Sequence, residues 1–136
     1  MKSRDTLIRL RRFQVDEKRR RVAQIETMVA EFARMAGDLD REIAAEEQRS
    51  GISDLAHFAY PTYAKAARTR RDNLKRSADE LTAQLSEAQA ELGEAFEALK
   101  KVEILDTRER SAERAAEAAR DQAAMDRIGL ARAMRA

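Results

Sequence analysis

Few residues in this chain have the types and spacing that catalysis or metal binding requires. His57 is the single histidine, and the chain has no cysteine. A zinc site needs several ligands close together, and a catalytic histidine needs an oriented partner group. The four glycines are scattered and form no phosphate-binding loop. We therefore predict no catalytic residue, no cofactor, no metal site and no enzyme activity.

Acidic residues gather in one stretch, at Asp38, Asp40, Glu42, Glu46 and Glu47. Carboxylates support metal binding or acid–base chemistry only when they converge on one point. Here they are spread along a predicted helix. We expect them to be surface charges that face the arginines Arg68, Arg70 and Arg71.

The composition is that of long helices. Charged residues make up 38% of the 136 residues and aromatic residues 4%, with one proline and a net charge of +2. Such a chain is unlike a globule with a thick core, and its near-neutral charge argues against nucleic acid as a partner. No apolar run approaches the roughly 20 residues that span a bilayer. We expect a cytoplasmic protein.

Two stretches carry apolar residues with the seven-residue repeat of a coiled coil, and in the later one they alternate at steps of four and three. The stronger one runs without a gap through Leu74, Ala78, Leu81, Leu85, Ala88, Leu92, Ala95, Leu99 and Val102. The earlier one has residues seven apart at Ile8, Val15, Val22, Val29, Ala36 and Ile43. Since neither helix can bury its stripe alone, we expect the two to pair.

Turn signals separate these helices. Ser50 and Gly51 are suited to end the first helix, and Ser53 and Asp54 to cap a short turn of helix that reaches Phe58. Pro61 suits the start of the second helix. The prediction is a single coiled-coil domain over residues 1–136, with helix one at about 4–49, a turn at about 50–61 and helix two at about 62–133.

An antiparallel pairing in which facing residue numbers add up to about 110 places large residues opposite small ones. Residues 1–21 carry nine basic and three acidic groups and would face a net acidic stretch at 89–109. Residues 22–63 carry three basic and eight acidic groups, against six basic and one acidic group at 64–76. The fold predicted is all-α, a long antiparallel two-helix coiled-coil hairpin with an overhanging C-terminal helix. Pairing between two chains remains open as an alternative.

The segment from Thr107 to the end outruns its expected partner. It has an alanine stripe followed by Met125, Ile128, Leu130 and Met134. A lone helix of this kind is marginally stable in water, so we expect it to dock on another molecule.

Aromatic residues gather at the turn, where Phe58, Tyr60 and Tyr63 are half of the six in the chain. They either cap the end of the coiled coil, against Ile43, Ile52 and Leu55, or anchor a partner, since such side chains are favoured at binding hot spots. Both readings stay open.

Three stretches resemble the FliJ family, the small coiled-coil component of the flagellar type III export apparatus. They are FAYPTY at 58–63, FEALKKVE at 96–103, and RDQAAMD at 120–126 with RAMR at 132–135. The resemblance implies a stalk similar to the γ subunit of rotary ATPases, which inserts into the ring of the hexameric export ATPase. It also implies contact with a membrane export gate protein and with export chaperones, on the cytoplasmic side of the membrane as a peripheral protein.

From the resemblance and the aromatic cluster together we expect a set of partner-binding residues. They are Phe58, Tyr60, Tyr63, Arg70, Arg120, Gln122, Met125, Asp126 and Arg132. The terminal half of the rod would enter the ATPase ring, and the turn would face the gate or the chaperones.

Two alternatives from other classes remain. The run Lys18-Arg19-Arg20-Arg21 would suit a basic-region coiled coil that binds nucleic acid, although it lacks the asparagine and paired alanines of such helices and has acidic partners in the same chain. The other alternative is a structural coiled-coil scaffold without a role in secretion.

Overall fold

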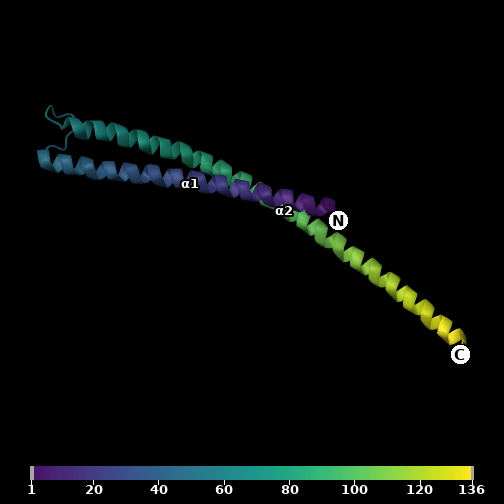
Figure 1. Ribbon diagram of the computed structural model, residues 1–136. Coiled ribbons are helices and arrows are strands. Elements are labelled where there is room, and N and C mark those ends of the chain that lie inside the picture. Colours follow the sequence, from purple (N-terminus) through teal and green to yellow (C-terminus); the bar gives the residue numbers. More distant parts are fainter. Residues whose placement is uncertain (1, 136) are drawn as a thin grey trace. The chain divides into compact units, whose positions relative to one another are not determined.

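The chain folds into two long helices joined by one turn. A computed structural model describes residues 2–135, in which α1 spans Lys2–Ser50 and α2 spans Thr62–Arg135 (Figure 1). Both bounds agree with the predicted helices to within two residues. The predicted all-α hairpin is confirmed, and the described residues contain no strand.

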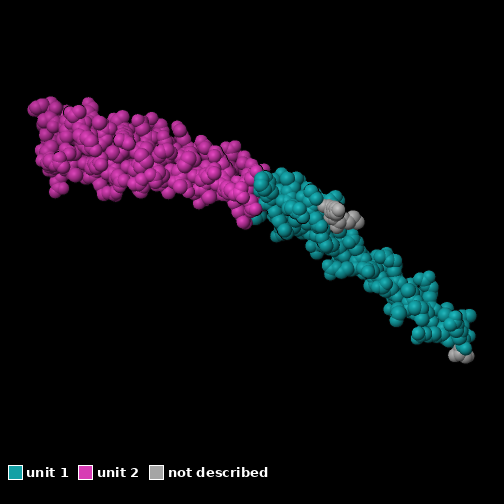
Figure 2. All heavy atoms as spheres, viewed as in Figure 1, with its two compact units in different colours: residues 1–14, 95–136 teal, residues 15–94 magenta. Residues whose placement is uncertain are grey.

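The contacts group the chain into two compact units. Unit 1 comprises residues 1–14 and 95–136, and unit 2 comprises residues 15–94 (Figure 2). Each unit pairs a stretch of α1 with a stretch of α2. That residues 1–136 form a single domain stays a prediction.

The core of unit 2 is a thin seam of aliphatic residues. Val22, Ile25 and Ala88 form a buried cluster, and Ile25 is only 1% exposed. Partly buried side chains pack against this cluster from both helices, namely Val29, Leu81, Leu85 and Leu92. These are the layers that the antiparallel register predicts.

Ion pairs between the helices confirm the register independently. In unit 2, Lys18 Nζ lies 3.1 Å from Glu91 Oε2, and Arg71 Nη1 lies 3.0 Å from Asp40 Oδ1. In unit 1, Arg4 Nε lies 3.2 Å from Asp106 Oδ1. Facing residue numbers in these pairs add up to about 110, as a regular antiparallel coiled coil requires.

The seam of α2 begins earlier than predicted. Ala64 and Ala67 are buried, and Tyr60 before them is 8% exposed. Together with Arg71 they continue the steps of four and three backward from Leu74. The same spacing was visible in the sequence, but an arginine at a seam position hid the continuation.

Local chemistry explains the ends of the helices. Gly51 has φ of 73°, and its N–H donates to the Glu47 carbonyl at 2.9 Å, so it closes α1 in the left-handed conformation that glycine favours. Asp54 Oδ1 accepts from the Ala56 N–H at 3.0 Å. Residues 54–57 form a single hydrogen-bonded turn, and the predicted turn of helix through Phe58 is therefore wrong. A helix at this point would compete with the local side-chain hydrogen bond of Asp54.

In unit 1 the first turns of α1 pack on α2 mainly through charge. Arg4 contacts Asp106, Glu109 and Glu113, and its Nη2 lies 3.3 Å from Glu113 Oε1. Arg110 Nη2 lies 3.0 Å from Asp5 Oδ1. These long side chains extend the contact between α1 and α2 about two turns beyond Asp106, the residue at which the sequence predicts that the contact ends. Past Glu113, all described residues of α2 are exposed except the partly exposed Ala124.

Candidate partner-binding surfaces

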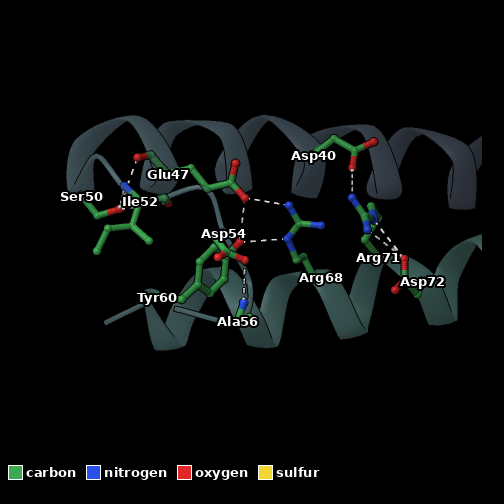
Figure 3. A network of polar contacts seen from close by, with 10 residues as sticks. All are labelled: Asp40, Glu47, Ser50, Ile52, Asp54, Ala56, Tyr60, Arg68, Arg71 and Asp72. Carbon is green, nitrogen blue, oxygen red and sulfur yellow. Dashed lines mark hydrogen bonds and ion pairs between the residues drawn. The ribbon is translucent and has the colours of Figure 1, made fainter. Parts of the chain in front are cut away.

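A triangle of polar side chains holds the base of the turn (Figure 3). The Tyr60 hydroxyl donates to Glu47 Oε1 at 2.8 Å and accepts from Arg68 Nε at 2.8 Å. Arg68 Nη2 also donates to Glu47 Oε1 at 2.7 Å. The guanidinium lies 5.9 Å from the centre of the Tyr60 ring, a cation–π arrangement. Since the three residues come from both sides of the turn, they fix how α1 leads into α2.

This network shifts the pKa of its carboxylate. The hydrogen bond from Arg68, and then that from Tyr60, lowers the pKa of Glu47 below its ordinary value of 4.5. The same contacts raise the pKa of Arg68. Both groups are partly exposed, so solvent screens the interaction.

We expect the Glu47 carboxylate to make the stability of unit 2 dependent on pH. A carboxylate with a lowered pKa contributes stability that is full above its unfolded pKa, near 4.5, and is lost as the pH falls through the lowered folded value. Wild type should therefore be more stable than Glu47→Gln at neutral pH, and this difference should shrink below pH 4.5. Urea unfolding at several pH values measures it. Parallel stability curves for the two proteins would contradict the prediction.

The other carboxylates of α1 divide between distant and local partners. Asp40 pairs with Arg71 of α2, which also pairs with Asp72 at 3.0 Å (Figure 3). Asp38 instead pairs with two residues of α1, with Arg34 at 3.2 Å and with Arg41. The expectation that Asp38 faces the arginines of the second helix is therefore wrong. Neighbours three or four residues away on the same helix are within reach of its short side chain.

Glu42 and Glu46 also miss the arginines expected opposite them. Glu42 Oε2 accepts from the Tyr63 hydroxyl at 2.7 Å, which raises the pKa of Tyr63. Glu46 pairs with Arg49 on α1 at 2.7 Å. Arg70 is exposed and takes part in none of these contacts.

The aromatic residues of the turn have two different roles. Tyr60 is buried in the triangle and caps the coiled coil. Phe58 is 97% exposed and stacks on the His57 ring, with the ring centres 4.8 Å apart, while Tyr63 is 54% exposed. The Ala59 N–H donates to His57 Nδ1 at 3.0 Å, which holds the loop beneath Phe58. The geometry thus separates a structural Tyr60 from an exposed apolar surface.

The remaining expected residues lie on the C-terminal part of α2, in unit 1. Gln122 Nε2 donates to Asp126 Oδ1 at 2.9 Å, one turn along the helix. Arg120, Met125 and Arg132 are exposed. Phe58, Tyr60, Tyr63 and Arg70 belong to unit 2, so the expected residues form two surfaces, one in each unit.

The sequence analysis named only the C-terminal part of the exposed apolar side chains of unit 1. Ten of the fourteen large exposed apolar residues in the described chain belong to unit 1. Six of them lie where α1 and α2 pair, namely Leu7, Leu10, Phe13, Phe96, Ile104 and Leu105. A groove of about 750 Å³ runs along α2 here, lined by apolar Phe96, Leu99 and Ile104. Large apolar residues outside the seam were the signal in the sequence.

Within residues 2–135, no group of three or more histidine, cysteine or acidic residues is arranged to hold a metal ion. No described helix is long and apolar enough to cross a membrane.

Comparison with known proteins identifies the family. No curated protein and no solved structure matches the chain. The sequence profile of the flagellar FliJ protein family matches residues 1–136, the whole chain. Together with the two-helix hairpin, this match shows that the chain belongs to the FliJ family, the structural components of the flagellar export apparatus.

Proposed function

We propose that this chain is the stalk of the flagellar export apparatus, with unit 1 inserted into the ring of the hexameric export ATPase. The exposed turn of unit 2 contacts the membrane export gate protein and export chaperones. The chain acts without catalysis, in the cytoplasm, as a peripheral protein of the membrane complex. The family assignment supports a place in the flagellar export apparatus. The exposed apolar side chains of unit 1 support its insertion into the ATPase ring.

The insertion is supported chiefly by the directions in which the exposed apolar side chains of unit 1 point. Ile8 is buried between α1 and α2, and Phe13, five residues on, lies roughly 140° round α1 from it. On α2, Asp106 contacts α1, and Ile104 lies roughly 160° round the helix from it. Both Phe13 and Ile104 are exposed. Apolar groups on opposite sides of a rod are better covered by a partner that encloses it than by one that binds a single side.

An asymmetric rod inside a symmetric ring would make the ATPase subunits inequivalent. This arrangement could link ATP hydrolysis to the gate without any catalytic group on unit 1 itself. The mechanism needs only that different subunits meet different faces of unit 1.

Nucleic acid has no place in this proposal. Lys18 forms an ion pair with Glu91, and Arg12 Nη2 lies 3.8 Å from Glu103 Oε2. Acidic residues of the same chain therefore neutralise part of the basic stretch. The aromatic and apolar exposure of unit 1 is also not a phosphate-binding surface.

Photo-crosslinking to the purified export ATPase tests the insertion. A photoreactive amino acid is placed at Phe13 or at Ile104, and at Met28 of unit 2 as a control with similar partial exposure. We expect crosslinks to the ATPase from both unit 1 positions and none from Met28. Crosslinks from only one side of unit 1, or mainly from Met28, would refute insertion into a ring.

A further inference from the structure

The outward face of α1 in unit 1 is uncharged and carries large apolar side chains. Leu7, Leu10 and Phe13 are 39%, 49% and 53% exposed. Because they follow one another at steps of three, they lie roughly 60° apart round the helix, on an arc of about 120°. Leu10, at the centre of this arc, lies roughly 160° from the buried Ile8 and so points away from α2. The arc ends before Glu17, which belongs to unit 2. We call its six residues the outer arc: Ser3, Thr6, Leu7, Leu10, Phe13 and Gln14.

Arginines border the outer arc on both sides. Arg9 lies about 40° beyond Phe13 round the helix, and Arg11 lies about 40° beyond Leu7. Arg9 is exposed, and among residues 2–135 neither arginine forms an ion pair. Arg11 Nη1 donates to the neutral Gln14 Oε1 at 3.1 Å, and its buried Nε has no hydrogen-bond partner. The positive charge at both edges of the arc is therefore not neutralised within the described chain.

α2 extends this surface on one flank of unit 1. The ion pair between Asp5 and Arg110 marks the other flank. Leu7 lies roughly 160° from Asp5 round α1, and Leu105 lies roughly 140° from Arg110 round α2. Leu7 and Leu105 thus share the flank without this ion pair, and Leu105 is 55% exposed. Two exposed basic residues lie within about 60° of Leu105 round α2, namely Lys101 and Arg108.

We propose that the outer arc, together with Leu105, binds the surface of a membrane that contains anionic lipids. A helix with apolar side chains on one face and basic residues beside them lies in the membrane interface, where the apolar groups enter the acyl region and the basic groups meet the lipid phosphates. Asp5 is the one acidic residue at positions 3–14, and it lies on the opposite flank. No carboxylate of α1 in unit 1 would therefore face the lipid phosphates.

Shape and charge together favour a membrane over a protein as the occupant. The outer side of a single helix is convex, so a flat and deformable lipid surface can cover it without a matching groove. The uncompensated charges at its edges, Arg9 and Arg11, are all of one sign, as an anionic surface requires.

The inference goes beyond the proposed function and shares Phe13 with it. An ATPase ring that encloses unit 1 would cover the outer arc, so the ring and the membrane would compete for the same residues. The membrane-bound chain is thus the form that is not inserted in the ring. Because lipid vesicles contain no ATPase, a failure of membrane binding and a failure of ring insertion can be told apart.

Co-sedimentation of the full-length chain with lipid vesicles tests the proposal. We expect the chain to bind vesicles of equal parts phosphatidylglycerol and phosphatidylcholine, and to bind phosphatidylcholine vesicles at least about tenfold more weakly. Leu10→Glu should weaken binding to the anionic vesicles at least about tenfold, because it places a carboxylate among the phosphates and removes apolar contact. Ile128→Glu is the matched control. Ile128 is 52% exposed in the same unit and lies on the face of α2 that carries Arg110, about five turns further on, so this variant should bind as wild type does.

Tryptophan fluorescence tests which residues enter the lipid, because the chain has no tryptophan of its own. The emission of a Phe13→Trp variant should shift to shorter wavelength when anionic vesicles are added, since the ring leaves water. Phe58→Trp, at the exposed turn of unit 2, is the matched control and should not shift. Both phenylalanines are more than half exposed, so neither replacement should disturb folding.

Three results would overturn the proposal. One is a wild type that does not bind anionic vesicles, with no shift in Phe13→Trp emission. Another is equal weakening by Leu10→Glu and Ile128→Glu, because binding would then depend on net charge and not on the outer arc. The third is a photoreactive residue at Leu10 that crosslinks to the ATPase while vesicle binding is absent, which would assign the outer arc to the ring.

Discussion

Replacing Ile25 with alanine is expected to lower the free energy of unfolding of unit 2 by about 2 to 5 kcal/mol, as for other buried aliphatic side chains. Ile25 is the largest fully buried side chain and lies at the centre of the cluster with Val22 and Ala88. A two-helix seam is only one layer thick, so neighbouring residues cannot close the cavity from behind. Urea unfolding followed by circular dichroism measures the change.

Met28→Ala is the matched control on the same helix. Met28 is 39% exposed and lies outside the buried cluster, so its loss should cost well under half as much as that of Ile25. Equal losses in the two variants would mean that the seam does not carry the stability of unit 2.

The double variant Phe58→Ala, Tyr63→Ala is expected to weaken binding of the chain to the export gate protein by at least about 30-fold. An aromatic hot-spot residue typically contributes about 2 kcal/mol or more to binding. Phe58 has almost no buried surface to lose in the free protein, and Tyr63 is half exposed. Helicity and melting temperature should therefore change little. Calorimetric titration with the cytoplasmic part of the gate protein measures the affinity.

Tyr60→Phe is the control for this experiment. It removes the hydroxyl that joins Glu47 and Arg68, and leaves the ring in place. It should lower stability by about 0.5 to 1.5 kcal/mol, the usual net contribution of a hydrogen bond, and leave gate binding unchanged. A double variant that instead loses stability and retains its affinity would show that Phe58 and Tyr63 only cap the coiled coil.

The fold was largely readable from the sequence because coiled-coil spacing is a local property. Steps of four and three predicted the seam, and blocks of opposite charge predicted the antiparallel direction. The observed pairs Lys18 with Glu91 and Arg71 with Asp40 agree with that register. Gly51 and Pro61 marked the turn through their backbone preferences, which also depend on single residues.

The candidate surfaces were only partly readable. Aromatic residues at the turn suggested a binding site, but the sequence did not separate Tyr60 from Phe58, two residues away. Which of them is buried depends on the direction in which the loop leaves α1, and the hydrogen bonds of Glu47, Asp54 and His57 determine this direction together.

By itself, then, the sequence determined the helices, their seam, their antiparallel register and the family of the chain. The tertiary structure decided which charged groups meet and which apolar groups remain in water. Asp38 forms ion pairs with Arg34 and Arg41 on its own helix, and Phe13 and Ile104 are exposed. The physical reason is that spacing sets the face on which a residue lies, whereas its burial and its partner depend on the distances between side chains brought together by folding.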